Sequence, residues 1–264
     1  MQMAKINGIT LHYADQGSRD STAIVFANSL GTDFRIWDRV AAELESEFRI
    51  VRYDKRGHGL SDCPPAPYAM QDHVDDLAAL LDHLEIKRAV IVGLSVGGMI
   101  AQGLFQTRPD LVLALVLSDT AHKIGDTAAW NVRIEAVREH GIAALSDAVL
   151  ARWFTDDFRK HRADEFAVCS NMLNRSPAEG YAGTCAALRD ADFTDLAPRI
   201  DVPTMLMVGS NDGSTPVDLV RTTHDLIPGS RFVVIEGPGH LPCIDEPEEV
   251  ARLVRGFIHE SLRG

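Results

Sequence analysis

Three side chains of this 264-residue chain have the types and the order that nucleophilic catalysis requires. Ser95 lies within residues 93–97, a G-x-S-x-G pattern that directly follows an apolar run. Asp212 and His240 each follow a later apolar run, in that order along the chain. A serine hydroxyl becomes a nucleophile when a histidine accepts its proton and a carboxylate orients the imidazole. We therefore predict Ser95 as the nucleophile, His240 as the base and Asp212 as the orienting acid.

Two backbone N–H groups complete this chemistry, because a tetrahedral intermediate needs donors for its oxyanion. A turn sharp enough to expose a serine hydroxyl brings backbones close together, which explains Gly93 and Gly97. The same turn places the Val96 N–H at the start of a helix. The second donor is expected in the loop after the early apolar run, Asn28-Ser29-Leu30-Gly31, and we assign it to the Leu30 N–H.

Alternatives exist for each of these assignments. Taken alone, the G-x-S-x-G pattern also fits a serine that caps a helix in a glycine-rich turn. Asp119 ends another apolar run and is an alternative acid, whereas Asp192 and Asp195 are interpreted as helix caps. His58, in "DKRGHGLSD", is the main alternative histidine but is interpreted as a turn residue. The other histidines that we weighed lie on helical or loop stretches away from a strand end: His73, His83, His161, His224 and His259.

Strands and helices that could position these residues alternate along the chain. Apolar runs of the kind buried on both faces of a parallel sheet occupy 23–28, 48–54, 89–94, 113–119, 204–210 and 231–237. Helical stretches are expected at 35–46, 71–85, 97–108, 217–227 and 247–262, the last with Asp245 as a possible N-cap and Pro247 in its first turn. The N-terminal "MQMAKINGITLHYAD" alternates like an edge strand. This alternation predicts an α/β fold, a mostly parallel central sheet flanked by helices.

The alternation stops between about Thr120 and Ala191, where helical spacing dominates. We therefore expect a core formed by residues 1–120 and 192–264, and an inserted helical cap formed by residues 121–191. A cap in this place would cover whatever site the sheet presents.

Composition and charge restrict the partners. The formal net charge is −12, which argues against nucleic acid and against an anionic membrane surface. The uncharged stretch 89–105 approaches the length of a membrane span, but its glycines and Gln102 favour a strand, a turn and a buried helix. The start of the chain lacks the apolar segment of a signal peptide, so we expect a cytoplasmic protein. Nothing in the sequence indicates an oligomeric state.

The cysteines and one basic turn are interpreted as structural. The four cysteines are far apart and lack the spacing of a zinc site, so reduced thiols are expected. Cys243 has no partner pattern that would make it reactive. Residues 56–59 form a tight turn after a strand, and Asp54 is expected to anchor it.

Taken together, the chain resembles the capped members of the α/β-hydrolase superfamily over nearly its full length. The segments that carry the resemblance are "FANSLGTDFRIWD", "VRYDKRGHGLSD", "VGLSVGGMIAQ", "LMVGSNDGSTP" and "EGPGHLPCIDEP". More narrowly it resembles the 3-oxoadipate enol-lactonases, because the first loop carries Asn28-Ser29-Leu30-Gly31 where the superfamily usually has His-Gly.

This resemblance implies a substrate and a reaction. The substrate would be a small five-membered enol-lactone with an acetate side chain, opened through an acyl-enzyme to 3-oxoadipate in the β-ketoadipate pathway of aromatic catabolism. No metal or cofactor is required. Other activities stay open on the same scaffold: a general carboxylesterase, a carbon–carbon bond hydrolase, a perhydrolase, or a ligand-sensing protein that keeps the fold and even the triad.

The free carboxylate of such a substrate needs a cation, since burying an unpaired charge is costly. Trp130 and Arg133 are three residues apart in a helical stretch of the insertion and would share one face. We expect Arg133 to bind the carboxylate and Trp130 to contact the ring. The alternative is that Arg133 lies on a solvated face and pairs with Glu135 or Glu139. Trp153 is a further aromatic candidate, more typical of a core residue.

Overall fold

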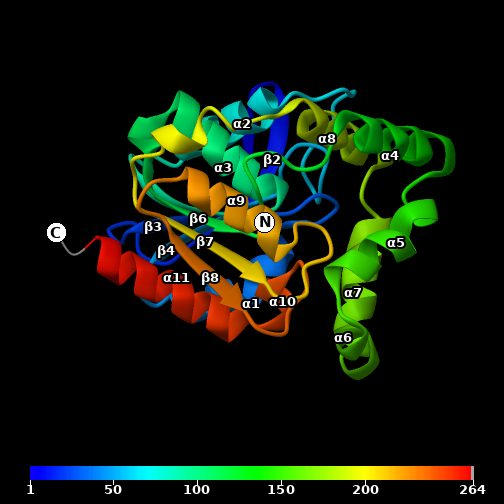
Figure 1. Ribbon diagram of the computed structural model, residues 1–264. Helices are drawn as coiled ribbons and strands as arrows, with labels where there is room; N and C mark the ends of the chain where they lie inside the picture. The colour runs from blue at the N-terminus through cyan, green and yellow to red at the C-terminus, as the bar shows by residue number, and fades with distance from the viewer. Residues whose placement is uncertain (263–264) are drawn as a thin grey trace.

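Eight strands form one sheet in the computed structural model of the chain (Figure 1), in the order β1-β2-β4-β3-β5-β6-β7-β8. The structure describes residues 1–262, so residues 263 and 264, the end of the expected second core segment, lie outside the described part. The pairs from β4 to β8 are parallel, as predicted. The strands are β1 (Gln2–Ile6), β2 (Ile9–Gln16), β3 (Ala23–Ala27), β4 (Arg49–Tyr53), β5 (Ala89–Leu94), β6 (Val112–Ser118), β7 (Thr204–Gly209) and β8 (Arg231–Ile235).

Two features of the sheet edges differ from expectation. The N-terminal segment is not one edge strand but an antiparallel hairpin, because Asn7 and Gly8 both adopt positive φ and form a two-residue turn. Strand β8 is half-exposed along most of its length, whereas its apolar sequence predicted burial on both faces. It lies at the edge of the sheet, next to β7.

Helices cover both faces of the sheet. Figure 1 shows α1 and α11 together on one face, with α2 and α3 on the other. The helices outside the insertion are α1 (Asp38–Leu44), α2 (Met70–His83), α3 (Val96–Thr107), α9 (Val217–Leu226), α10 (Pro242–Asp245) and α11 (Pro247–Ser261), with short 3₁₀ turns at Phe34–Trp37, Pro109–Leu111 and Ala197–Arg199.

Asp245 does not cap the last helix. It ends the short helix α10, and its carboxylate accepts a hydrogen bond from the Gly239 N–H at 3.1 Å. Helix α11 begins at Pro247, as expected, but its N-cap is Glu246, without a side-chain cap. Asp245 therefore stabilises the loop that carries His240 rather than the helix that follows.

Five helices lie between β6 and β7 along the chain, within residues 121–191. They are α4 (Thr127–His140), α5 (Ala143–Trp153), α6 (Asp156–His161), α7 (Ala163–Asn174) and α8 (Ala178–Asp190). Figure 1 shows α4 to α7 standing beside the sheet, with α8 near α2. We call α4 to α8 the inserted helices.

Within residues 1–262, none of the helices combines the length and the apolar character needed to cross a membrane. The uncharged stretch 89–105 is instead β5, a turn and most of α3. Its residues are buried against the neighbouring strands and helices.

Candidate active site

Ser95 occupies a strained turn between β5 and α3. Its φ is 58° and its ψ is −118°, a conformation that residues other than glycine rarely adopt. A Cβ at Gly97 would lie 2.1 Å from the Ala27 carbonyl oxygen, and a Cβ at Gly93 would lie 2.3 Å from the Gly97 oxygen. Only glycine fits at both positions, so the predicted sharp turn is present and Ser95 lies at the carboxyl edge of the sheet.

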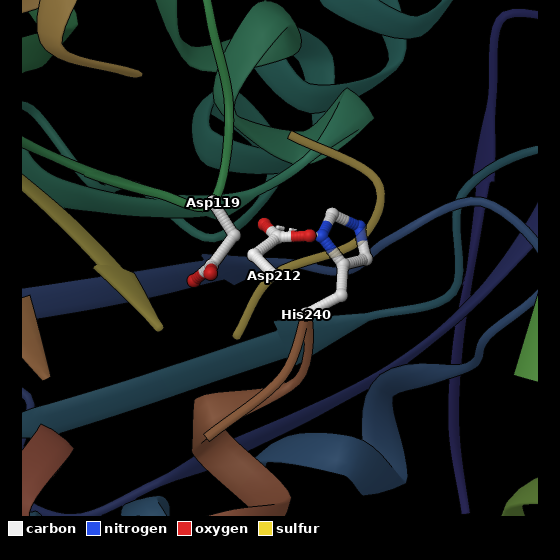
Figure 2. Close-up of side chains that lie close together, drawn as sticks. All are labelled: Asp119, Asp212 and His240. Carbon is white, nitrogen blue, oxygen red and sulfur yellow. Dashed lines mark hydrogen bonds and ion pairs between the residues drawn. The ribbon is translucent and has the colours of Figure 1, made fainter. Parts of the chain in front are cut away.

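Asp212 and His240 form a hydrogen-bonded pair at the same edge. His240 Nδ1 lies 2.9 Å from Asp212 Oδ2, and both side chains are buried (Figure 2). The Thr215 hydroxyl donates to the same Asp212 oxygen at 2.6 Å, and the Ser214 and Thr215 N–H groups donate to the other oxygen. Burial raises the pKa of Asp212, but the His240 charge and these hydrogen bonds outweigh it and hold that pKa below its usual value. Asp212 is therefore held as a carboxylate facing the imidazole.

The alternative acid, Asp119, lies beside this pair but is not bonded to the imidazole. Figure 2 shows Asp212 between Asp119 and His240, and one oxygen or nitrogen from each residue lies within 4.8 Å of the others. The two Asp119 oxygens accept from the Gly209 N–H and from the Ser118 hydroxyl. Burial and the neighbouring Asp212 carboxylate raise the pKa of Asp119 well above its usual value. The environment of Asp119 thus favours its protonated form, whereas that of Asp212 favours the carboxylate.

Asp192 and Asp195, the two residues interpreted as helix caps, cap none of the described helices. Asp192 closes a turn by accepting from the N–H and hydroxyl of Thr194, and it pairs with Lys123. The Asp195 carbonyl accepts from Arg199.

Ser95 and His240 open onto one cavity of about 340 Å³. Its floor includes Ser29 and Leu30 from the loop after β3, and its other walls come mostly from the inserted helices. The larger residues that these helices contribute are Trp130, Arg133, Leu145, Arg152, Trp153, Tyr181 and Leu188. The cavity therefore brings the predicted nucleophile and base together with both predicted cap residues.

The two predicted oxyanion donors also belong to this region. Val96 is the first residue of α3, so its N–H has no acceptor within the helix. In the loop after β3, no acceptor among residues 1–262 takes the Leu30 N–H, whereas His58 Nε2 accepts the Gly31 N–H at 3.0 Å. The loop therefore leaves the Leu30 N–H free beside the cavity.

His58 has a part in this loop that the sequence did not reveal. It lies in a turn, as predicted, but its side chain is fully buried. Its Nδ1 faces the Arg56 carbonyl at 3.2 Å, so Nδ1 carries the proton and Nε2 accepts. Burial, and then the charge of Lys55, lower the pKa of His58 well below its usual value, which keeps the ring neutral.

Trp130 and Arg133 meet on one face of α4, as their spacing predicted. The Arg133 guanidinium lies 5.2 Å from the centre of the Trp130 ring. The Trp130 Nε1 donates to the Ile124 carbonyl at 2.7 Å, which fixes the ring at the cavity wall. Among residues 1–262, Arg133 forms no ion pair, so the alternative pairing with Glu135 or Glu139 is not present. Its charge is available to the cavity.

The end of α5 is bonded directly to the loops that carry Asp212 and His240. The Arg152 carbonyl accepts from the Gly213 N–H at 3.2 Å, and the Trp153 carbonyl accepts from the His240 N–H at 2.9 Å. A Cβ at Gly239 would lie 2.2 Å from the Trp153 oxygen. Trp153 is both a core residue, as expected, and part of the cavity wall.

Sequence reasoning missed several residues of the site. Tyr181 and Arg152 line the cavity but lie in helices whose orientation no local pattern shows. Thr215, three residues after Asp212, could have been noticed as a hydroxyl near the acid.

The structure agrees with the structural roles predicted for Asp54 and Cys243. The Asp54 carboxylate accepts from the Leu60 and Phe34 N–H groups, and Cys243 is buried, which raises its pKa.

An eight-stranded, mostly parallel sheet with helices on both faces, and a cavity at its carboxyl edge that holds Ser95 and His240, define an α/β hydrolase. Residues 22–247 match the family described as "alpha/beta hydrolase fold", and the chain belongs to that family. It is a hydrolase.

Two curated enol-lactonases and one enol-lactonase crystal structure are similar to this chain over nearly its full length. The chain is 35% identical to 3-oxoadipate enol-lactonase 1 of Acinetobacter baylyi over 252 residues, which cover 95% of this chain and 94% of that protein. It is 34% identical to 3-oxoadipate enol-lactonase 2 of the same organism, over 91% and 90% of the two chains. The crystal structure of the enol-lactonase from Burkholderia xenovorans LB400 has a TM-score of 0.95, at 35% identity, over 98% of this chain and all of that one.

Proposed function

We propose that the protein is a 3-oxoadipate enol-lactonase that acts in the cytoplasm and converts the lactone to 3-oxoadipate in the β-ketoadipate pathway. The observation that carries the proposal is the cavity, which presents Ser95, His240 and the unpaired Arg133 to one small ligand. The names of the relatives at 34% and 35% identity supply the substrate. A volume of about 340 Å³ suits a small lactone and lies near the low end for ligand pockets.

The reaction would proceed through an acyl-enzyme. His240 accepts the Ser95 proton while the oxygen attacks the lactone carbonyl, and the Leu30 and Val96 N–H groups donate to the oxyanion. The ring C–O bond then breaks, and the enolate oxygen that leaves takes the proton from His240. Water, activated by the same imidazole, hydrolyses the acyl-enzyme and restores Ser95. Asp212 keeps the His240 Nδ1–H oriented and stabilises the imidazolium.

Substrate selection would rest on the inserted helices, which we propose act as a cap over the site. Arg133 would bind the carboxylate of the acetate side chain, and Trp130 would cover the ring. A neutral ester would form no ion pair with Arg133. The anionic lactone would form one, and its carboxylate would be buried without a partner if Arg133 were removed.

The test compares hydrolysis of 3-oxoadipate enol-lactone and of a neutral p-nitrophenyl ester by four proteins: wild type, Ser95→Ala, Arg133→Ala and Arg138→Ala. We expect Ser95→Ala to abolish turnover of both substrates. Arg133→Ala should raise KM for the lactone by about 10- to 100-fold, the value of a charge-assisted hydrogen bond, and leave the ester unchanged. Arg138 is exposed on the same helix and provides the matched control.

Equal efficiency on the ester and the lactone, with no effect of Arg133→Ala, would contradict the proposal and indicate a general carboxylesterase. Trace turnover of every substrate, together with stabilisation of the fold by the lactone, would indicate a ligand sensor.

A further inference from the structure

A buried lysine lies directly behind the loop that carries Leu30. Lys55 follows β4, and its side chain is among the largest fully buried ones, with 1% of the residue exposed. Its Nζ donates to the Ser29 carbonyl oxygen at 2.6 Å. A lysine is almost never buried this fully without a partner, and here its hydrogen-bond partner is a backbone carbonyl.

The groups around Lys55 leave its charge only partly compensated. The carboxylates of Asp54 and Asp33 favour the charged form, while the imidazoles of His58 and His73 lie nearby. Asp33 is bound by Arg35, and Asp54 accepts from backbone N–H groups and from His12. Burial outweighs both carboxylates and lowers the pKa of Lys55 to about 7. Burying a lysine at this position costs free energy, and a function of Lys55 would account for that cost.

The geometry of the peptide bond between Ser29 and Leu30 indicates a function for Lys55. The Ser29 carbonyl and the Leu30 N–H belong to one peptide unit, which is planar and trans, so the two groups point in opposite directions. The carbonyl is held on the core side by Lys55, by the Thr32 hydroxyl at 2.9 Å and by the Thr32 N–H at 3.3 Å. The Leu30 N–H must then point away from the core, and both Ser29 and Leu30 line the cavity.

We propose that Lys55 is a positioning residue that orients and polarises the Ser29–Leu30 peptide, so that the Leu30 N–H is a preorganised and strengthened donor to the oxyanion. A donor on the carbonyl oxygen draws electron density away from the peptide nitrogen, and hydrogen bonds in such a chain strengthen one another. His58 takes the neighbouring Gly31 N–H, while no acceptor among residues 1–262 takes the Leu30 N–H. This inference rests on the proposed mechanism, in which an oxyanion forms at Ser95.

Two variants test the role of Lys55. Lys55→Met keeps the length of the side chain but removes the ammonium donor, and Thr32→Val removes the hydroxyl donor to the same carbonyl with little change of shape. Lys87→Met makes the first substitution at an exposed lysine and is the matched control. Each protein is assayed for kcat and KM on the lactone, and for the rate at which a fluorophosphonate labels Ser95, followed by intact mass. Urea unfolding reports on the fold.

We expect Lys55→Met to lower kcat and the labelling rate by about 10- to 100-fold, somewhat less than removal of an oxyanion donor itself. KM should change less than threefold, since the ground-state lactone does not need the strengthened donor. Thr32→Val should show a smaller loss of the same kind, and it carries the test if Lys55→Met does not fold.

Unchanged kcat and labelling in both folded variants would overturn the inference, as would a loss confined to KM, which indicates a merely structural role. Failure of the proposed function is distinguishable from either result. In that case wild type is labelled at Ser95 but does not open the lactone, and the labelling rates of the variants still decide the role of Lys55. If wild type is not labelled at all, both proposals are wrong.

Discussion

At the scale of single residues, the site depends on where protons and charges are held. Asp212 and Asp119 are both buried and within reach of one another, yet their environments differ. Asp212 receives hydrogen bonds from two N–H groups, a hydroxyl and the imidazole, whereas burial and the Asp212 charge favour the protonated form of Asp119. The negative charge is therefore favoured on Asp212, beside His240, rather than on Asp119.

We expect the change of aspartate to asparagine to have a large effect on kcat at position 212 and a small effect at position 119. Asp212→Asn should lower kcat by about 10³- to 10⁴-fold, because the imidazole loses both its orientation and its counter-charge. Asp119→Asn should change kcat by less than about tenfold, because the amide is uncharged like the protonated form that the site favours, and Asp119 does not contact the imidazole. Retained activity in Asp212→Asn, combined with its loss in Asp119→Asn, would instead identify Asp119 as the acid.

Stability should respond to Asp119 in a pH-dependent way. Its folded-state pKa is raised, so above its ordinary pKa the folded state binds more protons than the unfolded state. The contribution of Asp119 to the stability of wild type is lost as the pH rises through this window, and Asp119→Asn lacks this contribution at every pH. The difference in free energy of unfolding between the variant and wild type should grow in favour of the variant from pH 4 to pH 7. Urea unfolding at several pH values measures it, and a difference that does not vary with pH would show that Asp119 is ionised.

At the scale of secondary structure, the sequence predicted the elements whose burial is local and repetitive. All six apolar runs became strands, β3 to β8, and all of them except the edge strand β8 are buried along nearly their whole length, as an apolar run predicts. The glycines around Ser95 identified the turn because only that geometry needs them. Asn7-Gly8 is a typical signal of a two-residue hairpin turn, but the alternating sequence around it also predicts a single strand.

Other features depend on contacts distant in sequence and leave no local signal. Nothing in "YDKRGHG" distinguishes the buried Lys55 from an exposed one, since its partner Ser29 is 26 residues away. Likewise, helical spacing placed Arg133 beside Trp130 but did not show which carbonyls of α5 meet the His240 loop.

The close approach of α3 to β3 is the element-scale feature most open to test. A methyl group at Gly97 would lie 2.1 Å from the Ala27 carbonyl oxygen, so Gly97→Ala should force the helix away from the strand. We expect a loss of about 1–3 kcal/mol in the free energy of unfolding, together with a large fall in kcat as Ser95 moves.

Gly256→Ala is the control for this substitution, because a methyl group there would meet no atom within 4 Å. Gly256 lies in the interior of α11, where alanine should stabilise the protein by roughly 0.5–1 kcal/mol. Chemical denaturation measures both variants, and equal effects at the two positions would contradict the role of the close approach.

At the scale of the whole molecule, the net charge opposes the proposed substrate. A chain with a formal charge of −12 repels an anionic lactone at long range, while Arg133 and Arg152 attract it within the cavity. The long-range repulsion acts through water and is screened by salt, whereas the half-buried Arg133 is screened less.

We therefore expect kcat/KM for the lactone to rise by roughly two- to tenfold between about 20 and 200 mM NaCl, as the repulsion is screened. The neutral p-nitrophenyl ester should show no such dependence and serves as the control. A fall in kcat/KM for the lactone over the same range would show that the cavity arginines already dominate at the distance where encounter is decided.

The hydrogen bonds from the end of α5 to the Gly213 and His240 N–H groups also restrict how this protein can be rebuilt. If the inserted helices were replaced by those of another hydrolase, the carbonyl groups that accept these two hydrogen bonds would change position. The loop that carries His240 would then shift, so a change of substrate specificity would also displace the catalytic base. A chimera that keeps residues 152–154 of this chain retains both hydrogen bonds. The segment that can be exchanged is therefore shorter than the whole insertion between β6 and β7.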